Sequence, residues 1–380
     1  MPSLTIPFTL LRASRYANPG SEADILPEVY GDFALGGLSG PIPAVLIDDV
    51  NWVYCAAAHA VEAITTVYVD DVAQSSGFTS SVSNNYESQG VIATIDFTSQ
   101  PTGVVTWRGR GKQSGGALIT NPITQLEDLL LTRGGFAAAD FDTVALELAR
   151  TTATLKDYQL AWVVNDERQV AEWLTEWLFN VAGAWRVTGS DRLVLLADDG
   201  NIPTPDQITV NIVASRDCGG DEEVTISGNV DHLVNALTVH YLWSWSLGQA
   251  SSRIITEEDT ISKNGHLGTE IRKGVTLKGH RRARDVAAWA DVIFLRQAFR
   301  HRRNGAIAEF PIIGPKFLHG VPGDWITLTW PWGPRTIGES SFTQHICKVL
   351  AVRHESHGPG AKTTVEALLT GESLLTSQGF

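Results

Sequence analysis

The chain has 380 residues, long enough for two or three domains. With 43% hydrophobic and 19% charged residues, its composition is that of a globular protein with few surface charges. Its 29 Lys and Arg residues stand against 42 Asp and Glu residues, a formal net charge of -13. This balance argues against general, sequence-independent binding of nucleic acid. It allows an acidic surface along which DNA passes without binding.

Three cysteines, Cys55, Cys218 and Cys347, are far apart in the sequence, and none belongs to a CxxC pair. Their number and spacing indicate neither a zinc site nor an iron–sulfur cluster, and they predict no disulfide framework. The first 20 residues lack a basic segment followed by a continuous apolar core, so we expect no signal peptide. No run of about 18 apolar residues occurs, so we expect no membrane anchor.

The first part of the chain predicts β structure. Short runs rich in Val, Ile, Thr and aromatic residues are separated by Gly, Ser, Asn and Pro, and they occupy residues 41–48, 63–71, 90–97 and 103–109. Between two of them lies a polar stretch, SSGFTSSVSNNYESQG (75–90), which predicts an exposed and mobile loop.

The middle of the chain predicts helices. Residues 121–135 begin with Asn121 as N-cap and Pro122 at the first helical position, and they end at Gly134-Gly135. Further helices are expected over 139–151 and 166–184, and a hairpin over 185–197.

The last part is again rich in β patterns. Strands are expected over 235–243, 306–313, 324–330, 345–355 and 363–370, with one long helix over 280–305. The fold class predicted is α+β, mainly β, with β-barrel-like domains around a helical and mixed segment. The expected domains are 1–115 (N-terminal, β-barrel-like), 116–200 (mixed α/β) and 201–380 (C-terminal β with the long helix).

One tryptophan-rich stretch, GDWITLTWPWGP (323–334), raises the question of a ligand platform. Its alternation places Thr327 and Thr329 on the face of Trp325, and Ile326, Leu328 and Trp330 on the other. Because a turn precedes it and prolines follow it, we interpret it as a sharply bounded strand, with at least one of its tryptophan rings buried.

Motifs for catalysis do not emerge. RGRGKQSGG (108–116) lacks the spacing of a phosphate-binding loop and predicts a flexible basic loop. There is no G-x-S-x-G nucleophile elbow, and His345, His354 and His357 lack the spacing of a zinc-protease helix. Paired acids such as Asp70-Asp71 stand beside turn signals. We therefore expect no enzymatic activity, no catalytic, cofactor-binding or metal-binding residues, and no cofactor.

The long helix, 280–303, is the only concentration of cations, with Arg281, Arg282, Arg284, Arg296, Arg300, Arg302 and Arg303. Nucleic-acid binding is one interpretation. Packing is favoured, because Val286, Trp289, Ala290 and Ile293 need a core face and the arginines suit acidic partners.

Several stretches, taken in order, resemble the baseplate hub or tail-tip hub proteins of tailed bacteriophages. They are LPEVYGD (26–32), GPIPAVLID (40–48), AITTVYVDDV (63–72), NPITQLEDLLLTRGGFAAADFDTVAL (121–146), GSDRLVLL (189–196), VDHLVNALTVHY (230–241), DTISKNGHLGTE (259–270), the long helix, VPGDWITLTW (321–330) and KVLAVRHESHGPGAKTTVEALL (348–369). The similarity spans most of the chain, and the order of the motifs carries it.

The resemblance implies a trimer of tail-tube-like β-barrels around a DNA channel, located in the virion at the tail tip and assembled in the host cytoplasm. The implied partners are other copies of the chain, the distal tail or tail-tube protein, the tape-measure protein and tip or fibre proteins. DNA would pass without specific binding. Relatives with lytic domains are known in the family, but only about ten residues follow Leu369, so no such fusion is expected. The four cysteines that hold an iron–sulfur cluster in some relatives are also missing.

A second class of function is a glycan-binding or carbohydrate-active tail-associated protein that uses its 12 tryptophans as stacking platforms. Tryptophan is more often a core or interface residue, which favours the structural role. For a DNA channel we expect acidic side chains to face the threefold axis and helix 280–303 to lie away from it. The candidate acids are Asp70, Asp71, Asp198, Asp199, Glu257 and Glu258.

Overall fold

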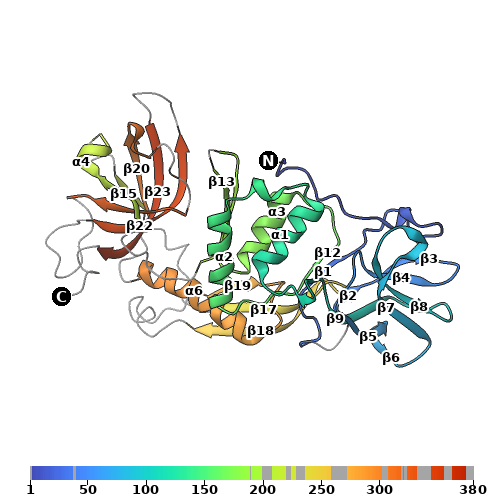
Figure 1. The fold of residues 1–380 in the computed structure, drawn as a ribbon. Helices are drawn as coiled ribbons and strands as arrows, with labels where there is room; N and C mark the ends of the chain where they lie inside the picture. Colours follow the sequence, from blue (N-terminus) through green and yellow to red (C-terminus); the bar gives the residue numbers. More distant parts are fainter. Residues whose placement is uncertain are drawn as a thin grey trace. The chain divides into compact units, whose positions relative to one another are not determined.

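The computed structural model describes residues 2–36, 40–188, 190–198, 208–219, 224–227, 236–257, 272–301, 307–317, 320, 323–331, 344–354 and 362–373. Strands predominate over helices in this part of the chain, which confirms the α+β, mainly β fold class (Figure 1). The chain divides into two compact units. Unit 1 contains residues 1–199, 238–256 and 274–289, and unit 2 contains residues 200–237, 257–273 and 290–380.

The N-terminal half of unit 1 contains two four-stranded antiparallel sheets, with strand orders β3-β4-β8-β7 and β2-β9-β5-β6. Their strands are β2 (Ile42–Pro43), β3 (Val45–Asp48), β4 (Val53–Ala57), β5 (Ala63–Val69), β6 (Val72–Gln74), β7 (Phe78–Asn84), β8 (Ile92–Phe97) and β9 (Val105–Arg110). Val67, Ile95 and Trp107 are buried in a shared core, and the Trp107 indole donates a hydrogen bond to the carbonyl of Ala56 (3.0 Å). The four strand segments expected in this region are therefore confirmed.

The prediction of a mobile loop over residues 75–90 is wrong. Residues Phe78–Asn84 form β7, which pairs antiparallel with β8, and a short 3-10 helix, η2, follows at Tyr86–Ser88. The stretch is polar because much of β7 is exposed at the end of its sheet. Its Phe, Thr and Val residues nevertheless have high strand propensity, and the neighbouring strand satisfies the backbone on one side.

Three helices follow in unit 1, where Figure 1 shows them grouped in green: α1 (Pro122–Arg133), α2 (Thr143–Leu155) and α3 (Val170–Phe179). The Asn121 side chain accepts hydrogen bonds from the backbone N–H groups of Ile123 and Thr124, so it is the N-cap that the sequence predicts. Asp142 caps α2 in the same way. Gly135, just after α1, has a φ of 71°, a conformation that glycine adopts readily.

The helices and the N-terminal strands of unit 1 share one core. Strand β1 (Glu28–Tyr30) pairs with β12 (Trp162–Val164), and the side chains of Val29 and Val163 pack with those of the two sheets. The Trp162 ring stacks on Trp177 of α3 with the ring centroids 4.7 Å apart. The predicted division into domains at residues 115 and 200 stays a prediction.

The described residues also form three smaller sheets. The predicted hairpin at 185–197 is present as β13–β14, a second small pair is β10–β11, and a three-stranded sheet has the order β18-β17-β19. These strands are β10 (Gln113–Ser114), β11 (Ala117–Leu118), β13 (Ala184–Val187), β14 (Leu193–Leu196), β17 (Ala236–Ser244), β18 (Gln249–Glu257) and β19 (Arg272–Thr276). Helix α6 (Ala283–His301) follows, close to the predicted span of 280–305.

Unit 2 is built on one six-stranded sheet with the order β15-β21-β22-β23-β20-β16. Its elements are β15 (Ile208–Val213), α4 (Ala214–Asp217), β16 (Thr225–Ser227), β20 (Ile307–Ile313), η7 (Pro315–Phe317), β21 (Trp325–Thr329), β22 (His345–His354) and β23 (Lys362–Ser373). One face of this sheet forms an apolar core that includes Phe310, Ile312 and Val365. The strands predicted over 306–313, 324–330, 345–355 and 363–370 are all present.

The tryptophan-rich stretch forms β21 as predicted. Ile326 and Leu328 are fully buried and Trp330 is 8% exposed, so this face belongs to the core of unit 2. Trp325 is half-buried, and the Lys348 ammonium lies 5.1 Å from the centre of its ring. Gly323, with a φ of 96°, forms the turn before the strand. The strand interpretation is confirmed, and its residues beyond Pro331 lie outside the described part of the chain.

Candidate functional site

The basic helix is the strongest functional candidate in the sequence, and its first turn is tied to neighbouring groups. The Arg282 guanidinium pairs with Asp285 at 2.8 Å, and Arg284 pairs with Asp157 at 2.5 Å. Val286, Trp289 and Ala290 are buried, which confirms the predicted core face. Arg302 and Arg303 lie outside the described residues, as do the side chains of Arg296 and Arg300.

Among the described cations of this group, Arg281 is the most buried, at 6% exposure. Its guanidinium donates hydrogen bonds to the carbonyls of Trp243 (2.8 Å) and Gly36 (3.3 Å) and lies 5.4 Å from the centre of the Phe33 ring. Burial, helped by the nearby Arg108 charge and opposed by Asp32, lowers the pKa of Arg281 to about 10. It therefore remains charged at neutral pH and holds backbone segments together.

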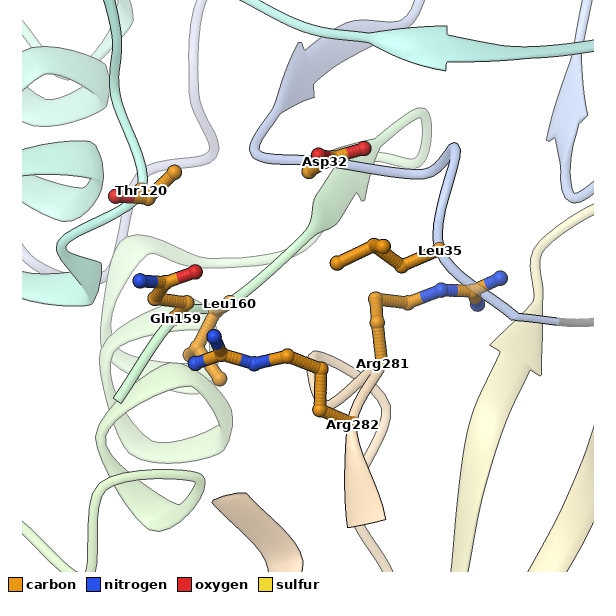
Figure 2. A pocket seen from close by; sticks show the side chains of 7 residues that line it. All are labelled: Asp32, Leu35, Thr120, Gln159, Leu160, Arg281 and Arg282. Carbon is orange, nitrogen blue, oxygen red and sulfur yellow. The ribbon is translucent and has the colours of Figure 1, made fainter. Parts of the chain in front are cut away.

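A small cavity lies beside these arginines (Figure 2). It is lined by Asp32, Leu35, Thr120, Gln159, Leu160, Arg281 and Arg282. In Figure 2 the Arg282 guanidinium points toward Gln159 and Leu160, whereas the Arg281 guanidinium points away from them. The cavity volume of ≈ 10 Å³ is room for about one water molecule, so it does not accommodate an organic substrate.

A buried polar cluster links β1 to α1 within unit 1. Glu28, 1% exposed, pairs with Arg133 of α1 at 2.5 Å and lies 3.6 Å from the ring of His59. Nearby, Asp128 accepts hydrogen bonds from the Tyr30 hydroxyl and the Lys112 ammonium, both at 2.6 Å. Burial, together with the negative charges of Glu28 and Asp128, raises the pKa of Tyr30 well above its usual value.

The histidine of this cluster is held by the backbone on both ring nitrogens. The Val29 N–H donates to Nε2 (3.0 Å), so Nδ1 carries the proton and donates to the carbonyl of Ala60 (2.8 Å). Burial is the largest influence and lowers the pKa of His59. Both ring nitrogens of His59 are therefore engaged by backbone groups, and the imidazole ties Val29 to Ala60.

The stretch 108–116 is not a flexible basic loop, so that prediction is wrong. It contains the end of β9 and the hairpin β10–β11, which turns at Gly115 and Gly116 with φ values of 58° and 82°. Two of its three cations form ion pairs, Arg110 with Glu62 and Asp32, and Lys112 with Asp128. A backbone ladder and these ion pairs order the segment.

The remaining candidates from the sequence stay apart. The three cysteines are buried and form no disulfide with one another, and burial raises the pKa of Cys55 and Cys347. The imidazole of His354 lies 3.1 Å from the Thr363 hydroxyl, and His357 is outside the described residues. Within the part of the chain that the structure describes, no group of three or more His, Cys, Asp or Glu residues is placed to hold a metal ion.

Of the six predicted channel acids, two are fully described and exposed. Asp70 and Asp71 form the turn between β5 and β6 with φ values of 47° and 63°, and Asp70 also accepts a hydrogen bond from the Val104 N–H (2.8 Å). Asp198 is half-buried at the end of its described segment. Asp199, Glu258 and the side chain of Glu257 lie outside the described part. The turn assignment at residues 70–71 is confirmed, and their place in an assembly stays a prediction.

Sequence reasoning missed the Glu28 cluster and Arg281 as a buried residue. Both sets are assembled from residues separated by tens to hundreds of positions, for example Gly36 with Arg281. The one available signal is Glu28 itself, a carboxylate inside the apolar run LPEVY, because a charge there needs a buried partner.

No protein-family model matches the chain, and no curated protein does. Among solved structures, it is similar to the tail protein from Neisseria meningitidis MC58, with 13% identity over 97% of this chain and 96% of that one, at a TM-score of 0.37. It is also similar to the 43 kDa tail protein of prophage MuSo2 from Shewanella oneidensis, with 10% identity over 96% and 94% of the two chains, at a TM-score of 0.35. The prophage tail protein gp18 from Listeria monocytogenes EGD-e shows 9% identity over 93% and 90% of the chains, at a TM-score of 0.29. Values this low leave the function of this chain to be argued from its own residues.

Proposed function

We propose that this protein is a structural component of a bacteriophage tail, a trimeric hub that joins the tail tube to the tip and fibre apparatus and surrounds the DNA channel. The observation that carries the proposal is the order of the hub-like motifs along the fold. They fall in sequence on β1, on β2 and β3, on β5 with the start of β6, on α1 with the start of α2, on β14, on β17, on α6, on β21 and on the β22–β23 hairpin. The motif at 259–270 lies outside the described residues.

The packing of polar groups also supports a structural role. Groups that serve as acids or bases in enzymes are engaged here in holding the fold: His59 bonds the backbone, Glu28 pairs with Arg133, and Asp128 binds Tyr30 and Lys112. Five of its tryptophans also belong to the core, since Trp107, Trp162, Trp173, Trp177 and Trp289 are fully buried. We propose that the chain has no enzymatic activity and requires no cofactor.

The proposed partners follow from a place at the tail tip: two further copies of the chain, a tail-tube or distal tail protein, the tape-measure protein, and tip or fibre proteins. The virion is the proposed location, after assembly in the host cytoplasm. Among the described helices, none has the length and apolar content needed to cross a membrane. DNA would pass through the channel without specific binding, consistent with a net charge of -13.

Light scattering on the purified full chain, alone and mixed with the tail-tube protein of the same virus, tests the proposal. The expected result is a discrete species that contains three copies of the chain. It forms either from the chain alone or only after the tail-tube protein is added. A monomer that stays monomeric in the presence of the tail-tube protein would overturn the hub assignment.

A further inference from the structure

A polar groove crosses the outer face of the unit 2 sheet, opposite the apolar core. Its volume is ≈ 360 Å³, within the range of small-ligand sites. Seven residues from four adjacent strands line it: Thr225, Glu309, Phe310, Pro311, Arg353, Lys362 and Thr364. Unlike the cavity of Figure 2, it has room for an organic ligand.

The strand register arranges these residues in rows across the sheet. Arg353 of β22 lies opposite Thr364 of β23, which lies opposite Pro311 of β20. Directly opposite residues share a face, so their side chains stand side by side. Two positions farther along β23, Glu366 lies opposite Glu309, which lies opposite Thr225 of β16.

The rows give the groove two chemically different ends. Arg353 and Lys362 are exposed cations at one end, and Glu309 is an exposed carboxylate at the other. The row of Arg353 and the row of Glu309 are two residues apart along the strands, which separates them by about 7 Å. Between them, Pro311 is buried and provides a rigid apolar floor. Hydroxyl groups of Thr225 and Thr364 line the walls, and the Thr225 hydroxyl donates to the Glu309 carbonyl (3.3 Å), which leaves its oxygen able to accept.

A ligand that matches this groove needs a negative charge at one end and hydroxyl groups at the other. A peptide strand would add at a sheet edge rather than on a face. A nucleic-acid strand would place phosphates against Glu309 and Glu366, and Phe310, the one aromatic residue that lines the groove, is fully buried in the core and offers no face on which bases could stack. A sugar acid satisfies both ends, because its carboxylate pairs with arginine and lysine while its hydroxyls donate to Glu309.

We propose that this groove binds a carboxylate-bearing saccharide, with Arg353 and Lys362 holding the carboxylate, Glu309 and Thr225 accepting from sugar hydroxyls, and the C–H face of the ring resting on Pro311. The inference goes beyond the structural role proposed above and does not depend on it. It differs from a tryptophan platform, since recognition here is by polar groups around a proline.

Calorimetric titration of the full chain with a galacturonic acid trisaccharide tests the site, with the neutral galactose trisaccharide and inorganic phosphate as comparison ligands. The acidic sugar should bind at least about tenfold more tightly than either, because each comparison ligand lacks one half of the match. Equal binding by the neutral sugar, or by phosphate alone, or no binding of the acidic sugar, would overturn the proposal.

Paired variants locate the binding. The double variant that combines Arg353→Gln and Lys362→Gln should bind the acidic sugar at least about tenfold more weakly, because two charge-assisted contacts are lost. The matched control is Arg253→Gln, an exposed strand arginine of β18 outside the groove, which should bind like the parent. Thermal melts of all variants confirm folding. Similar weakening in the control, or none in the paired variant, contradicts the site, while the trimer measurement remains a separate test of the tail proposal.

Discussion

Glu28 shows how single residues hold unit 1 together. It is buried against Arg133, and this pair joins β1 to α1. We expect Glu28→Gln to lower the free energy of unfolding by about 3–5 kcal/mol, because it leaves a mostly buried guanidinium without its counter-charge. Denaturant titration measures the loss. The control is Glu147→Gln, which removes a carboxylate that is 67% exposed and paired with Arg150, and a change within about 0.5 kcal/mol is expected there. Similar losses of unfolding free energy in the two variants would show that the buried Glu28–Arg133 pair contributes no more than an exposed one.

Buried histidine makes the stability depend on pH. His280 lies in the core with Nε2 bonded to the carbonyl of Asn180 at 2.7 Å, and burial lowers its pKa from 6.5 to about 4. Since the unfolded chain binds the proton more readily, the contribution is full above pH 6.5 and is lost as the pH falls from 6.5 toward 4. Between pH 7.5 and 5, the free energy of unfolding should fall by about 2 kcal/mol from this residue.

The variant His280→Gln separates this effect from other titrating groups. Its unfolding free energy should be lower at pH 7.5 but should depend less on pH down to pH 5, because the titrating imidazole is gone. His59, whose pKa burial also lowers, keeps part of the dependence in the variant. An unchanged slope between pH 7.5 and 5 in His280→Gln would show that His280 does not titrate as proposed.

At the scale of elements, strand β21 begins at Trp325 and is followed directly by Trp330, which gives a pair of tryptophans to compare. Trp330 is 8% exposed in the unit 2 core, whereas Trp325 is half-buried on the other face. We expect Trp330→Ala to cost about 3–5 kcal/mol and Trp325→Ala about 1 kcal/mol, because cavity formation adds to the loss of apolar burial only in the core. Chemical denaturation compares the two. Equal losses of unfolding free energy in the two variants would show that the face on which a ring lies does not determine its contribution to stability.

Local patterns predicted the elements whose signals lie within a few residues. Asn121, Pro122 and Gly134 define α1 because caps and helix starts are set by neighbours in sequence. The strand β7 was missed because its exposed Ser and Thr residues resemble a loop until β8 pairs with it. The groove of unit 2 was beyond prediction, since register alone brings Thr225, Glu309 and Thr364 together.

At the scale of the whole molecule, the net charge determines whether the protein binds DNA. The net charge is -13; near the start of α6, Arg282 and Arg284 are paired with carboxylates, and Arg281 is buried against backbone carbonyls. We expect no retention of duplex DNA in a gel-shift experiment at about 0.15 M salt, because the net negative charge opposes contact with the phosphate backbone. Retention that weakens steeply with added salt would instead favour a DNA-gripping helix.

A cryo-electron microscopy map of the assembled tail tests most directly whether the chain is a tail hub around a DNA channel. We expect three copies around the axis at one end of the tail tube. Acidic side chains, with Asp70 and Asp71 among the candidates, should line the channel, and α6 should lie away from the axis. A particle that lacks the chain, or a channel lined by Arg281 and the other arginines of the basic helix, would contradict the hub assignment.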